Sequence, residues 1–428
     1  MKDQKAKDQY GQVLDRVNKD ELADLALEMG NIYSPHGYEG EAGEYATDWF
    51  RKKGFETVKQ EVVPDRYNAV GIIRGQGGGK TLIYNAHLDT AWGTIEDRWC
   101  AGEPKRSDTK AWREGDALIG HSVLNAKGPI AAFMIAGKAI MESGIAIKGD
   151  LILAATVGEV GQAPIDEFQG PRYLGKGIGA EHLVAHGFMA DYALICETTN
   201  FTLGWAQPGD SFFKITVQGR PIYTTYIARP YKLEENPNAI VKMAKIILAL
   251  EEWAYDYQER NRSEYAGGTI IPKVALGAVR GGTPTKPLET SGLCSLYIDV
   301  RTPPHRTALD VKHEIQRVLD ATGIETHVET YLSKSGFIAQ NAEGLLESVQ
   351  RTHLGMFGRQ PEKADWTISS MWRDMNVFNA RGIPSATYGP GGGAGGGHLA
   401  LKVDDLVMAA KLYALIALDI CNQGLDDK

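Results

Sequence analysis

The stretch Thr81-Leu-Ile-Tyr-Asn-Ala-His87-Leu-Asp89-Thr90 decides the fold, because an apolar run ends there abruptly in two polar residues. The run from Leu82 to Ala86 predicts a buried strand. Residues two apart on a strand face the same side, so His87 and Asp89 leave its carboxyl end together. Open α/β sheets bind ligands at that end, and a carboxylate beside an imidazole is the usual support of a metal-bound histidine. The structural alternative is a surface histidine followed by a turn-starting aspartate.

Two further apolar strands are followed by acids in the same way. Leu151 to Thr156 leads to Glu159, and Ala190 to Cys196 leads to Glu197. If these strands share one sheet with the first, their carboxyl ends meet and the acids gather around the histidine. His398 follows a short strand and a glycine-rich loop, as a residue of the same site would. The sequence therefore predicts a metal or acid–base site at this sheet edge.

Composition limits the class of protein. The chain has 428 residues, 43% of them hydrophobic and 23% charged, which is typical of a soluble globular protein with room for two domains. A formal net charge of −8 disfavours nucleic acid as a partner. No apolar run approaches the roughly 18 residues of a membrane span, and the polar start has no signal-peptide core. Four dispersed cysteines without a CxxC pair favour free thiols and a cytoplasmic location.

The order of predicted elements indicates two domains. Residues 208–333 have the strand-helix-strand-strand-helix-strand order of a ferredoxin-like unit, with one strand expected over 269–279. The catalytic domain would then comprise 1–207 and 334–428, and its last helix is expected over 403–421. Residues 92–120 are predicted to be irregular.

Several motifs resemble those of the metallopeptidases and amidohydrolases that include glutamate carboxypeptidase, aminoacylase and acetylornithine deacetylase. The resemblance covers nearly the whole chain. It implies an α/β fold, in which a mixed-sheet, zinc-peptidase-like catalytic domain carries an inserted ferredoxin-like α+β lid and dimerisation domain. By position, His87, Glu197 and His398 match metal ligands of the family, Asp89 matches the residue that orients the first ligand, and Glu159 matches the general base.

Three positions depart from the family pattern. Asn125 stands where the family has an aspartate that bridges two metals, and Val160 replaces a second glutamate. The histidine of the lid domain corresponds to Tyr223, or in a shifted alignment to Thr224 or Thr225. Two close cations need a bridging anion. We therefore expect one divalent ion, manganese or zinc, held by His87 and Glu197 and by Asn125 and His398 as further candidate ligands.

These departures are similar to those of family members that deaminate 5-nitroanthranilate to 5-nitrosalicylate and ammonia. The resemblance implies a metal-dependent hydrolase of a carbon–nitrogen bond in a small carboxylate substrate, with Glu159 as general base and the family's homodimer formed through the lid domain. Tyr223, Arg301, Arg373 and Trp92 are candidate substrate-binding residues. Two alternatives remain open: an amidohydrolase, deacylase or dipeptidase acting on N-acyl amino acids, and a non-catalytic binding protein.

Overall fold

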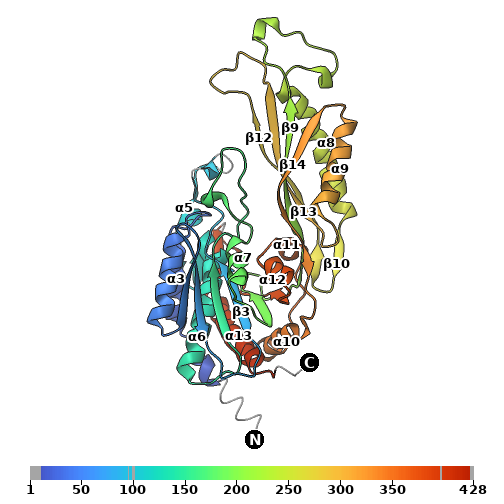
Figure 1. Ribbon diagram of the computed structural model, residues 1–428. Helices are drawn as coiled ribbons and strands as arrows, with labels where there is room; N and C mark the ends of the chain where they lie inside the picture. The colour runs from blue at the N-terminus through green and yellow to red at the C-terminus, as the bar shows by residue number, and fades with distance from the viewer. Residues whose placement is uncertain (1–10, 95, 99–101, 396–397, 425–428) are drawn as a thin grey trace. The chain divides into compact units, whose positions relative to one another are not determined.

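The computed structural model describes residues 11–94, 96–98, 102–395 and 398–424, and the chain divides into two compact units (Figure 1). The first unit contains 1–205, 339–364 and 373–428, and the second contains 206–338 and 365–372. Each unit has its own hydrophobic core. The segment 365–372 was not assigned to the inserted domain from sequence. It joins the second unit because its helix α11 (Trp366–Ser369) packs on β11 (Gly268–Ile270) and Ser370 accepts a hydrogen bond from the Ile271 amide.

The first unit is built on a six-stranded mixed sheet. Its strands lie in the order β1 (Glu56–Val63), β2 (Arg66–Ile73), β6 (Leu151–Thr156), β3 (Leu82–His87), β7 (Tyr192–Ile195) and β16 (Ser385–Thr387). The β6, β3, β7 and β16 strands are parallel, whereas β1 and β2 add an antiparallel edge. The carboxyl ends of β6, β3 and β7 therefore open at one edge of the sheet, as the strand pattern predicted.

Helices cover both faces of this sheet (Figure 1). On one face lie α2 (Lys19–Asn31), α3 (Gly40–Lys52), α6 (Gly128–Ser143) and α13 (Val403–Cys421). On the other lie α7 (Ile178–Ala185) and α12 (Met375–Ala380), while α10 (Glu343–Phe357) packs against α13 and β16. Side chains alternate accordingly. Tyr84 donates to the Tyr413 carbonyl in α13, whereas Asn85 donates to Thr156 on the opposite face.

The region 92–120 is not wholly irregular, which corrects the sequence expectation. It contains α5 (Arg106–Thr109), β4 (Trp112–Glu114) and β5 (Ala117–Ile119). These short strands form a small sheet with β17 (Gly393–Gly395) and β18 (His398–Lys402), in the order β17-β18-β5-β4. The β5 strand depends on pairing with β18 about 280 residues later, so no local periodicity announces it. The backbone of His398 begins β18, and its side chain lies outside the described residues.

The second unit has the predicted ferredoxin-like topology. Its elements follow as β9 (Gly209–Gln218), α8 (Ala239–Arg260), β12 (Val274–Gly281), β13 (Leu293–Thr302), α9 (Ala308–Ala321) and β14 (Thr326–Lys334). The strand order is β12-β13-β9-β14, with every pair antiparallel. Two short pairs complete the unit, β10 (Ser263–Tyr265) with β11 and β8 (Ala206–Gln207) with β15 (Phe337–Ile338).

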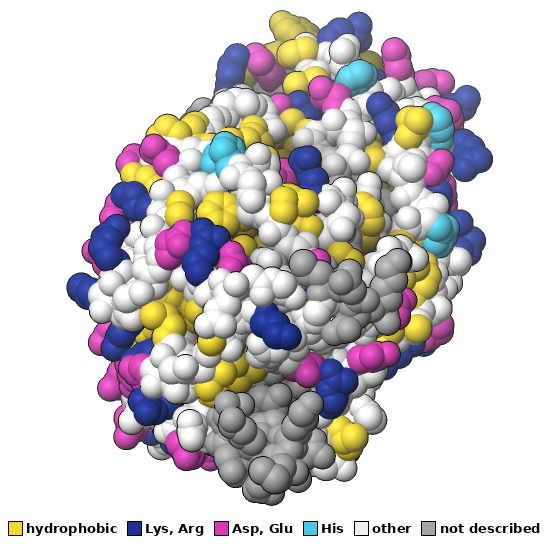
Figure 2. Space-filling view, turned by 60° about the horizontal axis from the view of Figure 1, so that its bottom comes forward, with side chains coloured by type: hydrophobic (Ala, Val, Ile, Leu, Met, Phe, Trp, Pro, Cys, Tyr) yellow, Lys and Arg dark blue, Asp and Glu magenta, His cyan; other side chains and the backbone are white. Residues whose placement is uncertain are grey.

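The strand expected over 269–279 is interrupted, because β11 ends at Ile270 and β12 begins at Val274. Pro272 lies in the gap, and proline cannot donate to a strand ladder. None of the described helices is long and apolar enough to span a membrane. On the face drawn in Figure 2, basic and acidic side chains are interspersed rather than gathered by sign.

Candidate metal centre and active site

Three strand ends bring the predicted site residues together in the first unit. His87 ends β3, Glu159 follows β6 by three residues, and Glu197 follows β7 by two. All three side chains are buried. The Nε2 atom of His87 lies 3.8 Å from Oε2 of Glu159, and the charge of Glu197 acts on both groups. The parallel order β6-β3-β7 explains this convergence, since all three strands end at the same edge.

The facing atoms of His87 and Asn125 fit a shared cation. The His87 Nδ1 atom lies 2.8 Å from the backbone oxygen of Asp89, which can only accept, so Nδ1 carries a proton. The Nε2 atom lies 3.1 Å from the amide oxygen of Asn125. Two ligand atoms at right angles around an ion, each about 2.1 Å from it, stand roughly 3 Å apart. Without a metal, Nε2 would need its own proton to bind this oxygen. A divalent ion between the two atoms could take the place of that proton.

The turn that carries Asn125 is irregular. Residues Val123–Lys127 form a π-helical turn before α6, within which Asn125 has φ −137° and ψ 92°. These angles lie outside the helical range, so Asn125 interrupts the helical backbone just before α6. Pro129 at the helix start and Gly144 at its left-handed end fix where the regular helix begins and stops.

The carboxylate of Asp89 contacts the backbone of Glu159 and Val160 more closely than it contacts the His87 ring. Its Oδ1 lies 3.4 Å from His87 Nδ1, farther than the backbone oxygen that the ring contacts. The carboxylate instead accepts hydrogen bonds from the backbone amides of Glu159 at 3.1 Å and Val160 at 2.8 Å. Burial alone would raise the pKa of Asp89, but the hydrogen bond from His36 and the adjacent imidazole of His87 hold it well below its usual value. Asp89 is thus a buried anion that joins two strand ends.

Glu159 has the electrostatics of a general base. Burial, together with the charges of Glu197 and Asp89, raises its pKa to about 7, although His87 and Lys176 act in the opposite direction. A carboxylate with a pKa near neutrality can both accept and return a proton.

Asp374 was not predicted from the sequence, and its pKa depends on its burial and on the charges of the same group of residues, including Glu159 and His87. It is buried, accepts a hydrogen bond from Thr156 at 3.2 Å, and its Oδ1 has no hydrogen-bond partner among the described residues. Burial and the charge of Glu159 raise its pKa well above the usual value. The segment before α12 gave no sequence signal, because an acid that starts a short helix is common.

Arg373, a candidate substrate-binding residue, forms a buried ion pair with Glu197. Its Nε donates to Glu197 Oε2 at 2.7 Å, and both side chains are buried. The second oxygen, Oε1, is also buried and has no hydrogen-bond partner within the described chain. Glu197 thus has one oxygen bound by a guanidinium and a second, buried oxygen that could hold a cation. The substrate-binding role of Arg373 stays a prediction.

The remaining candidates are dispersed. Trp92 lines a hollow of about 290 Å³ in the loop after β3, together with Arg98 and Lys105. Tyr223 and Arg301 belong to the second unit, where Tyr223 is about half exposed and Arg301 pairs with Asp210 and Asp299.

Two basic side chains near the site, His121 and Lys127, were not among the predicted site residues. His121 has both ring nitrogens buried without a hydrogen-bond partner in the described structure, and burial and the charge of His87 lower its pKa. Lys127 donates to the Ile32 carbonyl at 2.8 Å, and burial lowers its pKa to about 7. Both lie in the stretch that contains Asn125, where they could have been noticed as polar residues within an apolar segment.

A second group of potential ligands, His36, Glu39 and Asp89, is already occupied by protein contacts. Both oxygens of Glu39 accept hydrogen bonds from Arg66, at 2.8 and 2.7 Å. Both oxygens of Asp89 accept backbone amides, as described above. A cation there would have to displace these bonds, so the group is a structural network.

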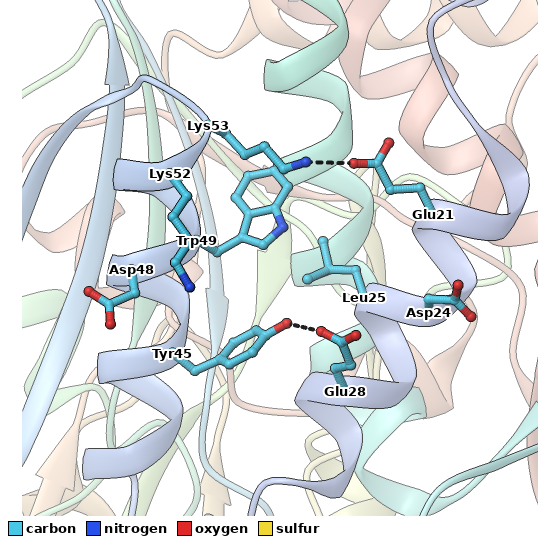
Figure 3. Close-up of a pocket in the computed structure, with 9 residues that line it drawn as sticks. All are labelled: Glu21, Asp24, Leu25, Glu28, Tyr45, Asp48, Trp49, Lys52 and Lys53. Carbon is cyan, nitrogen blue, oxygen red and sulfur yellow. Dashed lines mark hydrogen bonds and ion pairs between the residues drawn. The ribbon is translucent and has the colours of Figure 1, made fainter.

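The larger hollow between α2 and α3 lies apart from the strand ends (Figure 3). It has a volume of about 610 Å³, and polar side chains pair across it, Lys53 with Glu21 and Tyr45 with Glu28. None of the candidate ligands or bases lines it; its lining residues are Glu21, Asp24, Leu25, Glu28, Tyr45, Asp48, Trp49, Lys52 and Lys53.

Comparison with known proteins identifies the family. The model of peptidase family M20/M25/M40 matches residues 83–419. The N-formyl-4-amino-5-aminomethyl-2-methylpyrimidine deformylase of Bacillus subtilis (strain 168) is 27% identical over 326 residues, which cover 70% of this chain and 67% of the relative. A LysW-lysine/LysW-ornithine hydrolase of Saccharolobus solfataricus is 23% identical over 376 residues, covering 87% and 88%.

Solved structures show the same fold. Human carnosine dipeptidase 1 superimposes with a TM-score of 0.70 at 14% identity, over 97% of this chain and 99% of that one. The match to the family model spans most of the chain and includes His87, Asn125, Glu159 and Glu197. The protein therefore belongs to peptidase family M20/M25/M40 and is a metal-dependent hydrolase that acts on carbon–nitrogen bonds.

Proposed function

We propose that this hydrolase deaminates an aromatic amine that carries a carboxylate, with conversion of 5-nitroanthranilate to 5-nitrosalicylate and ammonia as the favoured reaction. The observation that carries the proposal is the set of side chains around His87, which supports a site for one cation. Asn125 offers a neutral oxygen to His87 Nε2, Val160 offers no ligand, and Arg373 neutralises one oxygen of Glu197. Family chemistry on peptides and acyl amides, as inferred from the motifs, uses two metals and a lid histidine, and neither is expected here.

The proposed cofactor is one divalent ion per chain, manganese or zinc. His87, Asn125 and Glu197 would hold it, with His398 as a further ligand, and mixed nitrogen and oxygen donors suit either metal. When bound, such an ion lowers the pKa of a coordinated water and thereby supplies a nucleophile at neutral pH. The buried, unpartnered Oε1 of Glu197 supports this assignment, because an uncompensated carboxylate oxygen is costly in a protein interior.

Glu159 would move the proton. It takes one proton from the attacking water and returns it to the leaving nitrogen, so that water and the arylamine give a phenol and ammonia. A pKa of about 7 suits both transfers. The charge that develops on the ring is spread over the nitro group, which reduces the need for the lid histidine that Tyr223 replaces. The candidate substrate-binding residues stay the four predicted from the sequence, Trp92, Tyr223, Arg301 and Arg373.

A second candidate is hydrolysis of an amide in an N-formyl or N-acyl compound or a dipeptide. The names of the relatives favour it, since they include a deformylase, a LysW hydrolase and a carnosine dipeptidase. Membership in a hydrolase family decides against the third possibility, a non-catalytic binding protein.

One experiment separates the two candidates. The metal-loaded protein is incubated with 5-nitroanthranilate and, in parallel, with N-formyl and N-acyl amino acids and dipeptides. We expect release of ammonia and 5-nitrosalicylate. Turnover of the acyl compounds alone would reject the deaminase, and Glu159→Gln is the control for contaminating activity in either case.

We also propose a homodimer formed through the second unit. Its edge strand β12 exposes much of its length, including Val279, and no neighbouring strand of the described chain pairs with its outer edge. Unpaired edges are common sites of association. Light scattering after size exclusion should give twice the chain mass of 46.7 kDa, and a monomer mass would reject this assembly.

A further inference from the structure

His36 lies in a segment that is bound to the end of β3. Its backbone amide donates to the Thr90 carbonyl at 3.1 Å, and the Thr90 amide donates back to Ser34 at 2.9 Å. The Ser34 hydroxyl also donates to the Leu88 carbonyl at 2.7 Å. These bonds hold residues 34–36 beside the strand exit that carries Asp89. The His36 ring is 98% buried there, with Nδ1 at 3.1 Å from Asp89 Oδ2.

The Asp89 carboxylate links His36 to the backbone of the proposed general base, Glu159. Because a carboxylate only accepts, His36 Nδ1 must be the donor. The same Oδ2 accepts the amide of Val160, and Oδ1 accepts the amide of Glu159. We infer that His36 is a positioning residue for Glu159, acting through Asp89. This inference rests on the proposed role of Glu159 as general base.

The loop after Glu159 also approaches the His36 ring. A Cβ atom added to Gly175 would lie 2.6 Å from Cε1 of His36 and 2.7 Å from the Val160 carbonyl, so only glycine lets the loop approach this closely. The imidazole therefore lies in contact with both the Asp89 carboxylate and Gly175, a residue of the loop that follows Glu159. Both the size of the His36 ring and its hydrogen bond to Asp89 should therefore affect the position of Glu159 and the loop that follows it.

A separate set of hydrogen bonds, made by Arg66, links the same two segments without involving His36. Arg66 binds Glu39 through two hydrogen bonds and donates to the carbonyls of Pro171 and Leu174, each at 2.7 Å. These hydrogen bonds tie the N-terminal segment to the far part of the loop, independently of the imidazole. Loss of the His36 donor should therefore disturb Glu159 locally and leave the unit folded.

Three substitutions test the inference. His36→Phe removes the donor and keeps a ring, His36→Asn keeps an N–H near the position of Nδ1, and His353→Phe is a matched control. His353 is equally buried and binds Tyr388 through Nδ1 at 2.7 Å, outside the candidate site. For the substrate that the enzyme turns over, His36→Phe should lower kcat about 10- to 100-fold, the range for residues that orient catalytic groups. KM and metal content should stay within about twofold, and His36→Asn should recover most of kcat.

A second readout needs no substrate. Hydrogen exchange of the peptide that contains Glu159 and Val160 should be about tenfold faster in His36→Phe than in the wild type, because both amides bind Asp89. It should return toward the wild-type rate in His36→Asn and stay unchanged in His353→Phe. If His36→Phe does not fold, His36→Gln takes its place, since its longer side chain moves the N–H away from the Nδ1 position.

Two results would overturn the inference: wild-type kcat and exchange in His36→Phe, or no recovery in His36→Asn. Failure of the proposed function looks different, because the wild type would then turn over only the acyl compounds, and failure of the base role of Glu159 would leave Glu159→Gln active. The exchange measurement decides the role of His36 in either case.

Discussion

His87 and Asn125 face each other across 3.1 Å, ring nitrogen to amide oxygen, while the other ring nitrogen is held by the Asp89 carbonyl. Removing the amide should therefore weaken metal binding. We expect Asn125→Ala to raise the dissociation constant for manganese or zinc about 10- to 100-fold. Asn125→Asp should bind at least as tightly as the wild type, because it keeps the oxygen and adds a charge. Chelator competition gives both values, and Asn422→Ala, at the end of α13, is the control. Unchanged affinity in Asn125→Ala would remove Asn125 from the ligand set.

Metal affinity should rise with pH. Burial alone would lower the pKa of His87, but the charges of Glu159, Asp89 and Glu197 raise it well above its ordinary value. Below that raised pKa the ring carries a proton that a cation must displace, so affinity should improve by up to about tenfold per pH unit for each proton released. Titrations at pH 6, 7 and 8 would show this trend, together with proton release on binding. Affinity independent of pH would contradict the assignment of His87 as a ligand.

Asp89→Asn should destabilise the first unit by about 3 kcal/mol, because the substitution places an amide N–H against the backbone donors of Glu159 and Val160. The folded pKa of Asp89 is depressed, so its contribution is fully present above the unfolded pKa of about 3.9 and is lost as pH falls through the folded value. Urea unfolding should show a constant difference between the two proteins from pH 5 to 8. The difference should shrink only below about pH 4. Asp404→Asn, on the exposed start of α13, should have little effect.

Glu159→Gln should abolish turnover while the metal stays bound. An amide cannot accept the proton of the attacking water, and loss of a general base costs about 10²–10⁴-fold in kcat. Elemental analysis should give the same metal content as the wild type, since Glu159 is not among the proposed ligands. Loss of metal from Glu159→Gln would move Glu159 from base to ligand. Glu362→Gln, which loses only a surface pair with Arg359, serves as control.

Much of the fold could be read from the sequence because local patterns determine it. The helix predicted over 403–421 has the observed bounds of α13, and β3 differs from its prediction only by including His87. Apolar periodicity is strong in both. The βαββαβ order likewise predicted the topology of the second unit, because right-handed crossover connections leave few possible strand arrangements for that order.

The sequence predicted those site residues that directly follow a buried strand. Glu159 and Glu197 follow buried strands, whereas His36 meets Asp89 across 53 residues and Arg373 meets Glu197 across 176. Such contacts depend on how loops return to the sheet, which a single sequence does not encode locally. Thr156 shows the same limit, because the strand predicted its burial and only the structure showed its bond to Asp374.

The central claim is a single cation that supports attack on a carbon–nitrogen bond at the ends of β3, β6 and β7. Its most direct test is the number of divalent ions per chain in fully active protein, measured by elemental analysis beside the His87→Ala variant. The account predicts one ion in the active wild type and none in His87→Ala. Two ions per active chain, or full activity with no ion, would contradict it.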